Sequence, residues 1–211
     1  MNMNLNQLDT DLFLWINQHH CAASDWTFWV ASQSWSWAIV LVLAFLLTTL
    51  RHEPSRWWLV LIGIALCFLF ADRTSVLIKD WVCRPRPCHT LENVHMFRTS
   101  CGGQYGFVSS HAANVFALAI FLTLRYLKST PRRTSPIHKH RAQHHFLFPS
   151  LIFLWALLVC YSRPYLGKHY PGDILCGAIL GLIIGTVIFI LLLLVENQIY
   201  NRNRKKKASA L

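Results

Sequence analysis

Five long apolar runs, separated by polar segments of different lengths, dominate the pattern of the chain. They cover about residues 35–50, 57–82, 111–127, 146–161 and 174–195. An α-helix needs about 20 apolar residues to span a bilayer, and these runs approach or exceed that length. Within lipid the backbone must satisfy its own hydrogen bonds, as it does in an α-helix. We therefore predict an all-α fold, a polytopic membrane helix bundle of about five transmembrane helices.

The N-terminal segment has a different pattern. Apolar side chains recur at helical spacing over residues 5–20, at Leu5, Leu8, Leu12, Trp15 and Ile16. The segment is too short and too polar to cross a bilayer, so it predicts an amphipathic helix lying at the interface. Residues 25–34 predict either a second interfacial or re-entrant piece or the first turns of the next helix. The predicted division is an N-terminal interfacial segment 1–34, a membrane-embedded domain 35–197 and a basic cytoplasmic tail 198–211.

Composition and charge agree with a membrane protein. The chain is 54% hydrophobic and 14% charged, against about 25% charged residues in an average soluble domain. Much of its formal net charge of +11 lies in two blocks that follow apolar runs, Arg125 to Arg141 and Arg202 to Lys207. Such blocks mark the cytoplasmic side of a membrane protein. We therefore expect the partner to be a lipid bilayer and not nucleic acid.

The same rule orients the bundle. The turn 51–56, the loop 128–145 and the C-terminal tail all fall on one side, which is the predicted cytoplasmic side. The loop 83–110 and the stretch 162–173 fall together on the other side, although both are basic. Tryptophans near the ends of the runs predict aromatic belts. These are Trp57 and Trp58 at the inner edge, and Trp35, Trp37 and Trp81 at the outer edge.

Cysteines and histidines give two further expectations. Cys83, Cys88 and Cys101 lie in or beside the outer polar loop, which allows one disulfide if that loop faces an oxidising compartment. Cys88 with Cys101 is the pair that we choose, with free thiols as the alternative. Histidines of the loop 128–145 suggest a metal site, but no cysteine or carboxylate supports them, so we expect none there. They are His138, His140, His144 and His145.

The stretch 162–173 concentrates ionisable residues at a membrane boundary, where such residues are usually functional. His169 and Asp173 are four residues apart, a spacing that would put them on one face of a helix. A carboxylate there can hold one imidazole nitrogen and leave the other free to attack. Pro171 suits the first turn of the following helix, whose N-terminus favours an anion. The stretch predicts phosphate chemistry at a membrane surface.

Two other clusters share the predicted outer side with this stretch. In chain order the three are Lys79-x6-Arg86-Pro87, Val108-Ser109-Ser110-His111 and Ser162-Arg163-x5-His169-x3-Asp173. Over about residues 57–195 their order and spacing resemble the three-part signature of the type 2 phosphatidic acid phosphatase superfamily, whose soluble relatives include vanadium haloperoxidases. The second cluster usually begins Pro-Ser-Gly-His, so Val108 and Ser110 depart from it. Only Ser109 and His111 match there, and we treat the departure as tolerated variation.

Residue chemistry and the resemblance imply the same roles for the basic and hydroxyl groups. A transferring phosphoryl group carries charge on three equatorial oxygens, so its catalysis is mainly positioning and electrostatics. Lys79, Arg86 and Arg163 supply three cations for those oxygens. Ser109 and the backbone N–H groups near Ser110, at the start of a helix, add donors to the phosphate site.

The resemblance also implies how the phosphate is transferred. His169 is the expected nucleophile and forms a phosphohistidine, while Asp173 orients it and stabilises the imidazolium. His111 protonates the leaving oxygen and then activates water. Because the three cations neutralise charge, no metal and no other cofactor is expected.

The resemblance implies an integral membrane lipid-phosphate phosphatase. The predicted orientation puts its site at the outer leaflet, which in a bacterium is the periplasmic face of the inner membrane. Undecaprenyl pyrophosphate, a lipid A phosphate and phosphatidylglycerophosphate all remain open as substrates. A lipid phosphotransferase using the same phosphohistidine, and a non-catalytic scaffold or transporter, are the alternatives. Other polar groups of the outer side are interpreted as solvated loop residues. They are Arg84, Arg98, Tyr105 and Lys168.

Overall fold

The computed structural model describes residues 4–50, 57–128 and 146–209, and within these ranges the chain is helical and forms no strand. The helices are α1 (Leu5–Gln18), α2 (Ala22–Ser32), α3 (Ser34–Leu50), α4 (Trp57–Val82), α5 (Pro87–Thr90), α6 (Ser110–Lys128), α7 (Leu147–Tyr165) and α8 (Pro171–Ala208). The histidines considered as a metal site lie outside the described residues, as do the turn 51–56 and nearly all of the loop 128–145. The all-α fold class is confirmed.

Four helices are long and apolar enough to cross a membrane, namely α4, α6, α7 and α8. The helices α2 and α3 meet at a bend of 63° and make a fifth span if they are counted together. Residues 25–34 thus belong mostly to a separate helix that leads into the next one at an angle. The side chain of Trp37 stabilises the bend, because its indole N–H donates to the carbonyl oxygen of Ala31 at 2.9 Å.

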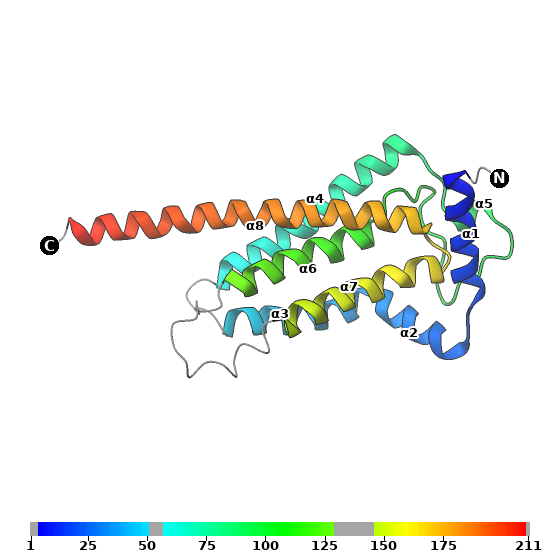
Figure 1. Cartoon of the computed structure of the whole chain (residues 1–211), viewed down its shortest axis with the longest axis horizontal. Coiled ribbons are helices and arrows are strands. Elements are labelled where there is room, and N and C mark those ends of the chain that lie inside the picture. The colour runs from blue at the N-terminus through cyan, green and yellow to red at the C-terminus, as the bar shows by residue number, and fades with distance from the viewer. Residues whose placement is uncertain (1–3, 51–56, 129–145, 210–211) are drawn as a thin grey trace.

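Two helices extend beyond the predicted spans. The helix α7 continues past residue 161 to Tyr165 and so carries Arg163. The helix α8 starts at Pro171 and continues past residue 195 to Ala208 without a break at residue 198. Apolar length predicts the part of a helix that lies in lipid, whereas the helix itself continues wherever its backbone bonds remain favourable. In Figure 1 the C-terminal part of α8 extends well beyond the other helices.

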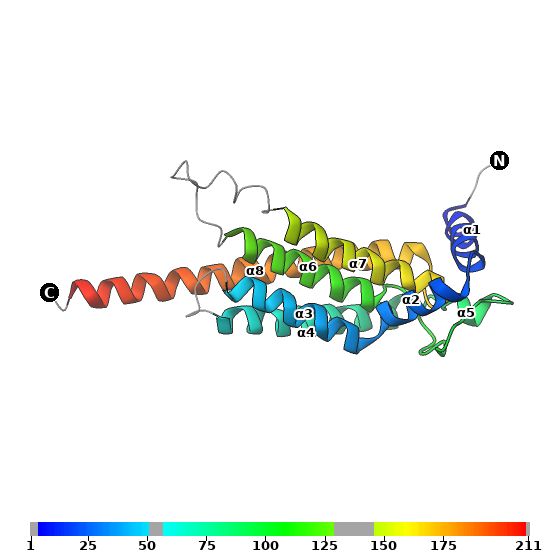
Figure 2. The ribbon, with the colours of Figure 1, turned by 90° about the horizontal axis from the view of Figure 1, so that it is seen from below.

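The core is centred on α6, which packs against α8, α4, α7 and α3 (Figure 2). Glycines every four residues along α8 face alanines of α6. A Cβ added to Gly181 would lie 2.3 Å from the carbonyl oxygen of Ala113, and one added to Gly185 would lie 2.3 Å from that of Ala117. Small residues therefore let the two backbones touch, as in many membrane helix pairs. This contact fixes the N-terminal ends of α6 and α8 beside each other.

Trp37 is wrongly predicted as part of an aromatic belt. It is buried, and its ring packs edge-on against His111 of α6 and Trp155 of α7. The outer-edge tryptophans Trp35 and Trp81 are exposed, as a belt requires. A tryptophan near the end of an apolar run can face either lipid or a neighbouring helix, and Trp37 faces the neighbouring helices.

The helix α1 crosses the end of the bundle where α6 and α8 begin (Figure 1). Phe13 and Asn17 are buried against the protein, while Leu8 and Leu12 are exposed. Ile16, which the sequence places on the apolar stripe, packs with Tyr165 and Leu166 instead. An exposed apolar face on a helix that lies across the bundle end agrees with the interfacial placement, which stays a prediction.

Candidate active site

A pocket of about 350 Å³ opens at this end of the bundle. Six of the eight predicted site residues line it, and all three sequence clusters contribute. These six are Lys79, Arg86, Ser110, His111, Arg163 and His169. Other lining residues are Ser34, Trp37, Asp72, Asn114 and Lys168. The remaining two predicted residues, Ser109 and Asp173, are completely buried and do not line the pocket.

The turn between α7 and α8 brings Arg163 and Lys168 together. The N–H of Gly167 donates to the carbonyl oxygen of Pro164 at 3.1 Å, and that of Lys168 donates to the carbonyl oxygen of Arg163 at 2.9 Å. This pair of bonds is the Schellman motif that ends many helices. Gly167 has φ +76°, and a Cβ there would lie 2.5 Å from Val94 Cγ1. Glycine is therefore required twice, for conformation and for space.

The expectation that His169 and Asp173 share a helix face is wrong. His169 lies before α8, whose first residue is Pro171 and whose N-cap is Tyr170. The two side chains meet because Asp173 folds back over the helix start, where its Oδ2 accepts the Tyr170 N–H at 3.0 Å. His169 Nδ1 lies 3.5 Å from the same oxygen. That distance puts the carboxylate beside the imidazole but is too long for a good hydrogen bond.

Buried positive charge surrounds His169, which is only 2% exposed. Burial, together with Arg163, Arg86 and Lys79, holds the pKa of His169 well below its usual range. The imidazole is therefore neutral at pH 7 and keeps a lone pair for attack. Within the described part of the chain, Arg163 Nε has no hydrogen-bond partner although it is buried. Buried polar groups are normally paired, so this guanidinium is arranged to take an anion.

Lys79 and Ser110 are in direct contact. Lys79 Nζ donates to Ser110 Oγ, which also lies 2.6 Å from Ser75 Oγ. The serine that replaces the usual glycine of the second cluster thus adds a hydroxyl to the pocket wall. Ser109 has a different position from the one expected for a phosphate donor. Its hydroxyl faces the Ala112 N–H at 3.5 Å, and its own N–H donates to the carbonyl oxygen of Asp173 at 3.0 Å.

A disulfide supports Arg86. Cys88 and Cys101 are bonded, which confirms that expectation. Arg86 Nη1 donates to the carbonyl oxygen of Cys101 at 2.8 Å, and its Nε donates to that of Tyr105 at 3.2 Å. Burial also lowers the pKa of Arg86 from its ordinary value. The cross-linked loop therefore holds this guanidinium in place at the pocket.

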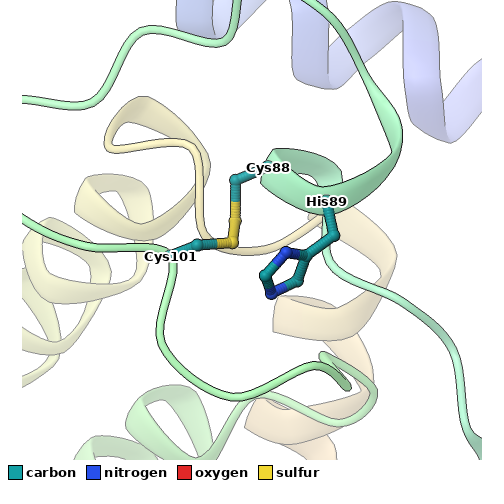
Figure 3. Close-up of side chains that lie close together, drawn as sticks. All are labelled: Cys88, His89 and Cys101. Atoms are coloured by element: carbon teal, nitrogen blue, oxygen red, sulfur yellow. A yellow bond between two sulfur atoms is a disulfide. The ribbon is translucent and has the colours of Figure 1, made fainter.

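Two groups of metal-capable side chains occur among the described residues. In the first, His89 lies beside the sulfurs of the Cys88–Cys101 disulfide (Figure 3), which in that state are not thiolate ligands. In the second, Asp25 Oδ1 accepts hydrogen bonds from Tyr165 and His95, both at 2.7 Å. The imidazoles of His20 and His95 stack with centroids 3.7 Å apart, and His95 already pairs with Asp25, so stacking and hydrogen bonding account for this group without an ion. We therefore assign a packing role to both groups.

Three charged residues at or beside the pocket, Lys168, Arg84 and Asp9, were not assigned to the site from the sequence. Lys168 is half-buried in the pocket, and Arg84 makes ion pairs with Asp173 and with Asp9 of α1, each at 2.7 Å. Residues two apart in an extended segment point to the same side. The Arg84-Pro85-Arg86 sequence therefore contains a signal that could have placed Arg84 near Arg86. Arg98 does not belong with these residues, because its guanidinium lies over the ring of Trp26, 4.8 Å from the centroid.

Known proteins are similar to this chain in sequence and in fold. The model of the PAP2 superfamily matches residues 57–195. A lipid A 4'-phosphatase of Porphyromonas gingivalis is 29% identical over 87% of this chain and 72% of its own length. One from Bacteroides thetaiotaomicron is 31% identical over 84% and 73%. The crystal structure of Aquifex aeolicus LpxE has a similar fold, with a TM-score of 0.57 and 21% identity over 89% of this chain and 98% of that one. The family match, together with the similarity to the Bacteroides enzyme, shows that this chain belongs to the PAP2 superfamily.

Proposed function

We propose that the protein is an integral membrane phosphatase that hydrolyses a phosphate of lipid A through a phosphohistidine intermediate. The observation that carries the proposal is the pocket itself. It gathers the side chains of Lys79, Arg86, Arg163 and Lys168 around the neutral imidazole of His169. A phosphate monoester carries a charge of about −1.5 to −2 at pH 7. Such an anion is the natural ligand of four cations in a half-enclosed site.

The first step of the proposed reaction is transfer of the phosphoryl group to the enzyme. His169 Nε2 attacks phosphorus while Asp173 holds the proton on Nδ1 and stabilises the imidazolium. The cations hold the three non-bridging oxygens as their charge changes. His111, in contact with Trp37 at the pocket wall, gives its proton to the oxygen of the leaving sugar.

The second step returns the enzyme to its starting state. His111, now without that proton, removes a proton from water, whose oxygen attacks phosphorus. The bond between phosphorus and His169 Nε2 breaks, and inorganic phosphate leaves. His111 ends the cycle protonated again, and His169 ends it neutral. Each step balances with water as the sole co-reactant, so no metal or other cofactor is invoked.

The lipid A assignment is supported by the two bacterial relatives, which are lipid A 4'-phosphatases. Apolar grooves beside the pocket support a substrate with acyl chains. Two grooves of about 580 and 510 Å³ share Trp155 and Leu158 of α7. Trp155 packs against Trp37, which also borders the phosphate pocket. A lipid with its phosphate at His169 would have apolar surface within reach for its chains.

The proposed location is the inner membrane, with the pocket facing the periplasm. The disulfide at the pocket end supports this side, because disulfides persist in oxidising compartments. The basic C-terminal part of α8, at the other end of the bundle (Figure 1), supports a cytoplasmic position for that end.

Phosphate release by the purified protein in detergent tests this function. The substrates are lipid A, undecaprenyl pyrophosphate and phosphatidylglycerophosphate, each with EDTA present. We expect release from lipid A, and we expect His169→Ala to reduce it by more than about 10⁴-fold. His19→Ala, which changes an exposed histidine of the N-terminal segment, is the matched control.

Three outcomes would contradict the proposal. Phosphate release by His169→Ala at the wild-type rate would exclude the histidine mechanism. A preference for one of the other two lipids would exclude the substrate assignment alone. Labelled phosphate that appears on an added lipid alcohol, and not as free phosphate, would identify a phosphotransferase.

A further inference from the structure

Arg84 links the N-terminal helix to the carboxylate that faces His169. Its Nη1 donates to Asp173 Oδ1 and its Nη2 donates to Asp9 Oδ2, both at 2.7 Å. The Asp173 side chain is completely buried, whereas those of Asp9 and Arg84 are 15% and 23% exposed. The planar fork of one arginine thus joins two carboxylates that lie far apart in the sequence. We call these three residues the Asp9–Arg84–Asp173 bridge.

Further contacts hold the bridge in one arrangement. Asp9 Oδ1 accepts the N–H of Gly172, in the first turn of α8, at 2.7 Å. A Cβ added to Gly172 would lie 2.9 Å from Asp9 Oδ2, so this close approach requires a glycine. The guanidinium of Arg84 also lies over the ring of Tyr170, 4.2 Å from its centroid. The helix α1 is therefore attached to the start of α8 at the catalytic pair.

The two oxygens of Asp173 have separate partners. Oδ1 accepts from Arg84, while Oδ2 accepts from the Tyr170 N–H and faces His169 Nδ1. With Oδ1 fixed, the carboxylate cannot rotate away from the imidazole. A buried carboxylate also needs a nearby cation to stay ionised. Although burial opposes it, pairing with Asp9 and Asp173 raises the pKa of Arg84, so that cation is always charged.

We infer that Arg84, held by Asp9 of α1, is a positioning residue that keeps Asp173 ionised and aimed at His169. The inference rests on the proposed function, because it assigns Asp173 its role through His169. It extends the active site to the N-terminal helix, which contributes no group to the pocket. Charged or titratable groups that interact with Asp173 are Arg84 and Arg86 from the loop after α4, Lys79 of α4, His169, and Cys176 of α8, while Asp9 of α1 pairs with the other side of Arg84.

The kinetic test compares Arg84→Gln, Arg84→Lys, Asp9→Asn and the double variant Asp9→Asn/Arg84→Gln. Arg84→Gln should lower kcat about 10–100-fold, with KM changed less than about twofold, because ground-state phosphate binding is left intact. The acid limb of its kcat profile should move to higher pH, because Asp173 loses the cation that favours its ionised form. Arg84→Lys keeps the charge and should recover part of kcat.

Asp9→Asn should lower kcat by less than Arg84→Gln, and the double variant should be no slower than Arg84→Gln alone, because both changes remove one linkage. Arg98→Gln is the matched control. This arginine of the same loop stacks on Trp26 and does not contact Asp173 in the described structure, so its pH profile should equal that of the wild type.

A measurement without substrate separates this inference from the proposed function. Nitrogen-15 NMR of ring-labelled histidine, with the His169 signals assigned by their loss in His169→Ala, reports the tautomer of that ring. The wild type should hold its proton on Nδ1, whereas Arg84→Gln should show a mixture of tautomers. If His169 has the same tautomer and the same titration in both proteins, the inference is wrong even where lipid phosphate is hydrolysed. If no lipid is hydrolysed, the proposed function fails, while the tautomer still decides the inference.

Discussion

Two ionic clusters attach α8 to its neighbours near its two ends, and they have opposite charge patterns. At the N-terminal end, one cation lies between two carboxylates in the Asp9–Arg84–Asp173 bridge. Near the other end, Glu196 lies between two cations of α6: Arg125 Nη1 donates to its Oε2 at 2.9 Å, and Lys128 Nζ donates to the same oxygen. In each cluster the carboxylate on α8, Asp173 or Glu196, is buried, and its cations come from other elements.

The difference between the clusters lies in what each one adjoins. Asp173 faces the His169 imidazole, so the bridge affects a group that reacts. Glu196 lies on a part of α8 remote from the pocket, beside the last turn of α6. Loss of either cluster should destabilise the protein, because a charge that is shielded from solvent loses an ion-pair partner. Only loss of the first should alter the chemistry, and measurements of kcat and stability on the same variants separate these two effects.

Replacement of Asp173 should have the largest effect on catalysis. Asp173→Asn keeps the side-chain shape but removes the charge that stabilises the His169 imidazolium and fixes its tautomer. We expect kcat to fall about 10³–10⁴-fold, as in other histidine–aspartate pairs. Steady-state phosphate release, with thermal denaturation to verify folding, provides the measurement. A variant that retains a tenth of the wild-type kcat would remove the functional contrast between the two clusters.

The sequence predicted the parts of the molecule that depend on local pattern. Apolar length identified the spans of α4 and α6 almost to the residue, because the lipid requirement acts on each run separately. Motif chemistry identified Lys79, Arg86 and Arg163, because their spacing is visible within single clusters. The four-residue spacing of His169 and Asp173 predicted their proximity, but for the wrong local reason, since Pro171 starts the helix between them.

Long-range partners were not predictable from one sequence. Arg84 is separated by 89 residues from Asp173 and by 75 from Asp9. The spacing of Arg84 and Arg86 could place Arg84 near the pocket, but it gives no indication that its partners are Asp9 and Asp173. The glycines at 181 and 185 have a visible spacing, but the sequence does not say which helix they face. Lys168 was interpreted as solvated from the sequence. Its position beside Arg163 depends on the turn at Gly167, which a pattern of residue types does not reveal.

Removal of the disulfide should change substrate binding more than turnover. In the variant Cys88→Ser/Cys101→Ser, the loop whose Cys101 carbonyl holds Arg86 loses its cross-link. We expect KM to rise about tenfold, the value of one charge-assisted hydrogen bond, with kcat changed less. Cys83→Ser, a change of an exposed free cysteine in the same loop, should leave both constants unchanged. An unchanged KM in the double variant would show that Arg86 is held without the cross-link.

Loss of the positive charge of Lys168 should weaken substrate binding at high pH. Burial, with Arg163 and Arg86 nearby, lowers the pKa of Lys168 to about 8. A lysine is charged below its pKa, so its attraction for phosphate is present below pH 8 and lost as the pH rises through that value. KM should therefore rise several-fold between pH 7 and 9. Lys168→Arg should remove this rise, because arginine keeps its charge. If KM rises equally with pH in the wild type and in Lys168→Arg, Lys168 is not the source of the rise.

Loss of this charge should not unfold the protein. The pKa of Lys168 in the folded state lies below its ordinary value of 10.5. The unfolded chain therefore binds more protons than the folded one between pH 8 and 10.5, and this group contributes stability that rises with pH in that window. Thermal denaturation in detergent from pH 7 to 9 should consequently show no loss attributable to Lys168, although KM rises.

Glu196→Gln should have the smallest effect on activity and a clear effect on stability. It leaves Arg125 and Lys128 of α6 without the carboxylate that now pairs with both. We expect a loss of about 1–3 kcal/mol of stability, seen as a lower denaturation temperature in detergent. Because Glu196 is remote from the pocket, the variant should have the same kcat, KM and acid limb of the pH profile of kcat as the wild type. A shift of the acid limb in Glu196→Gln would mean that the α6–α8 contact transmits charge effects along its length, and the contrast between the two clusters would then be one of degree.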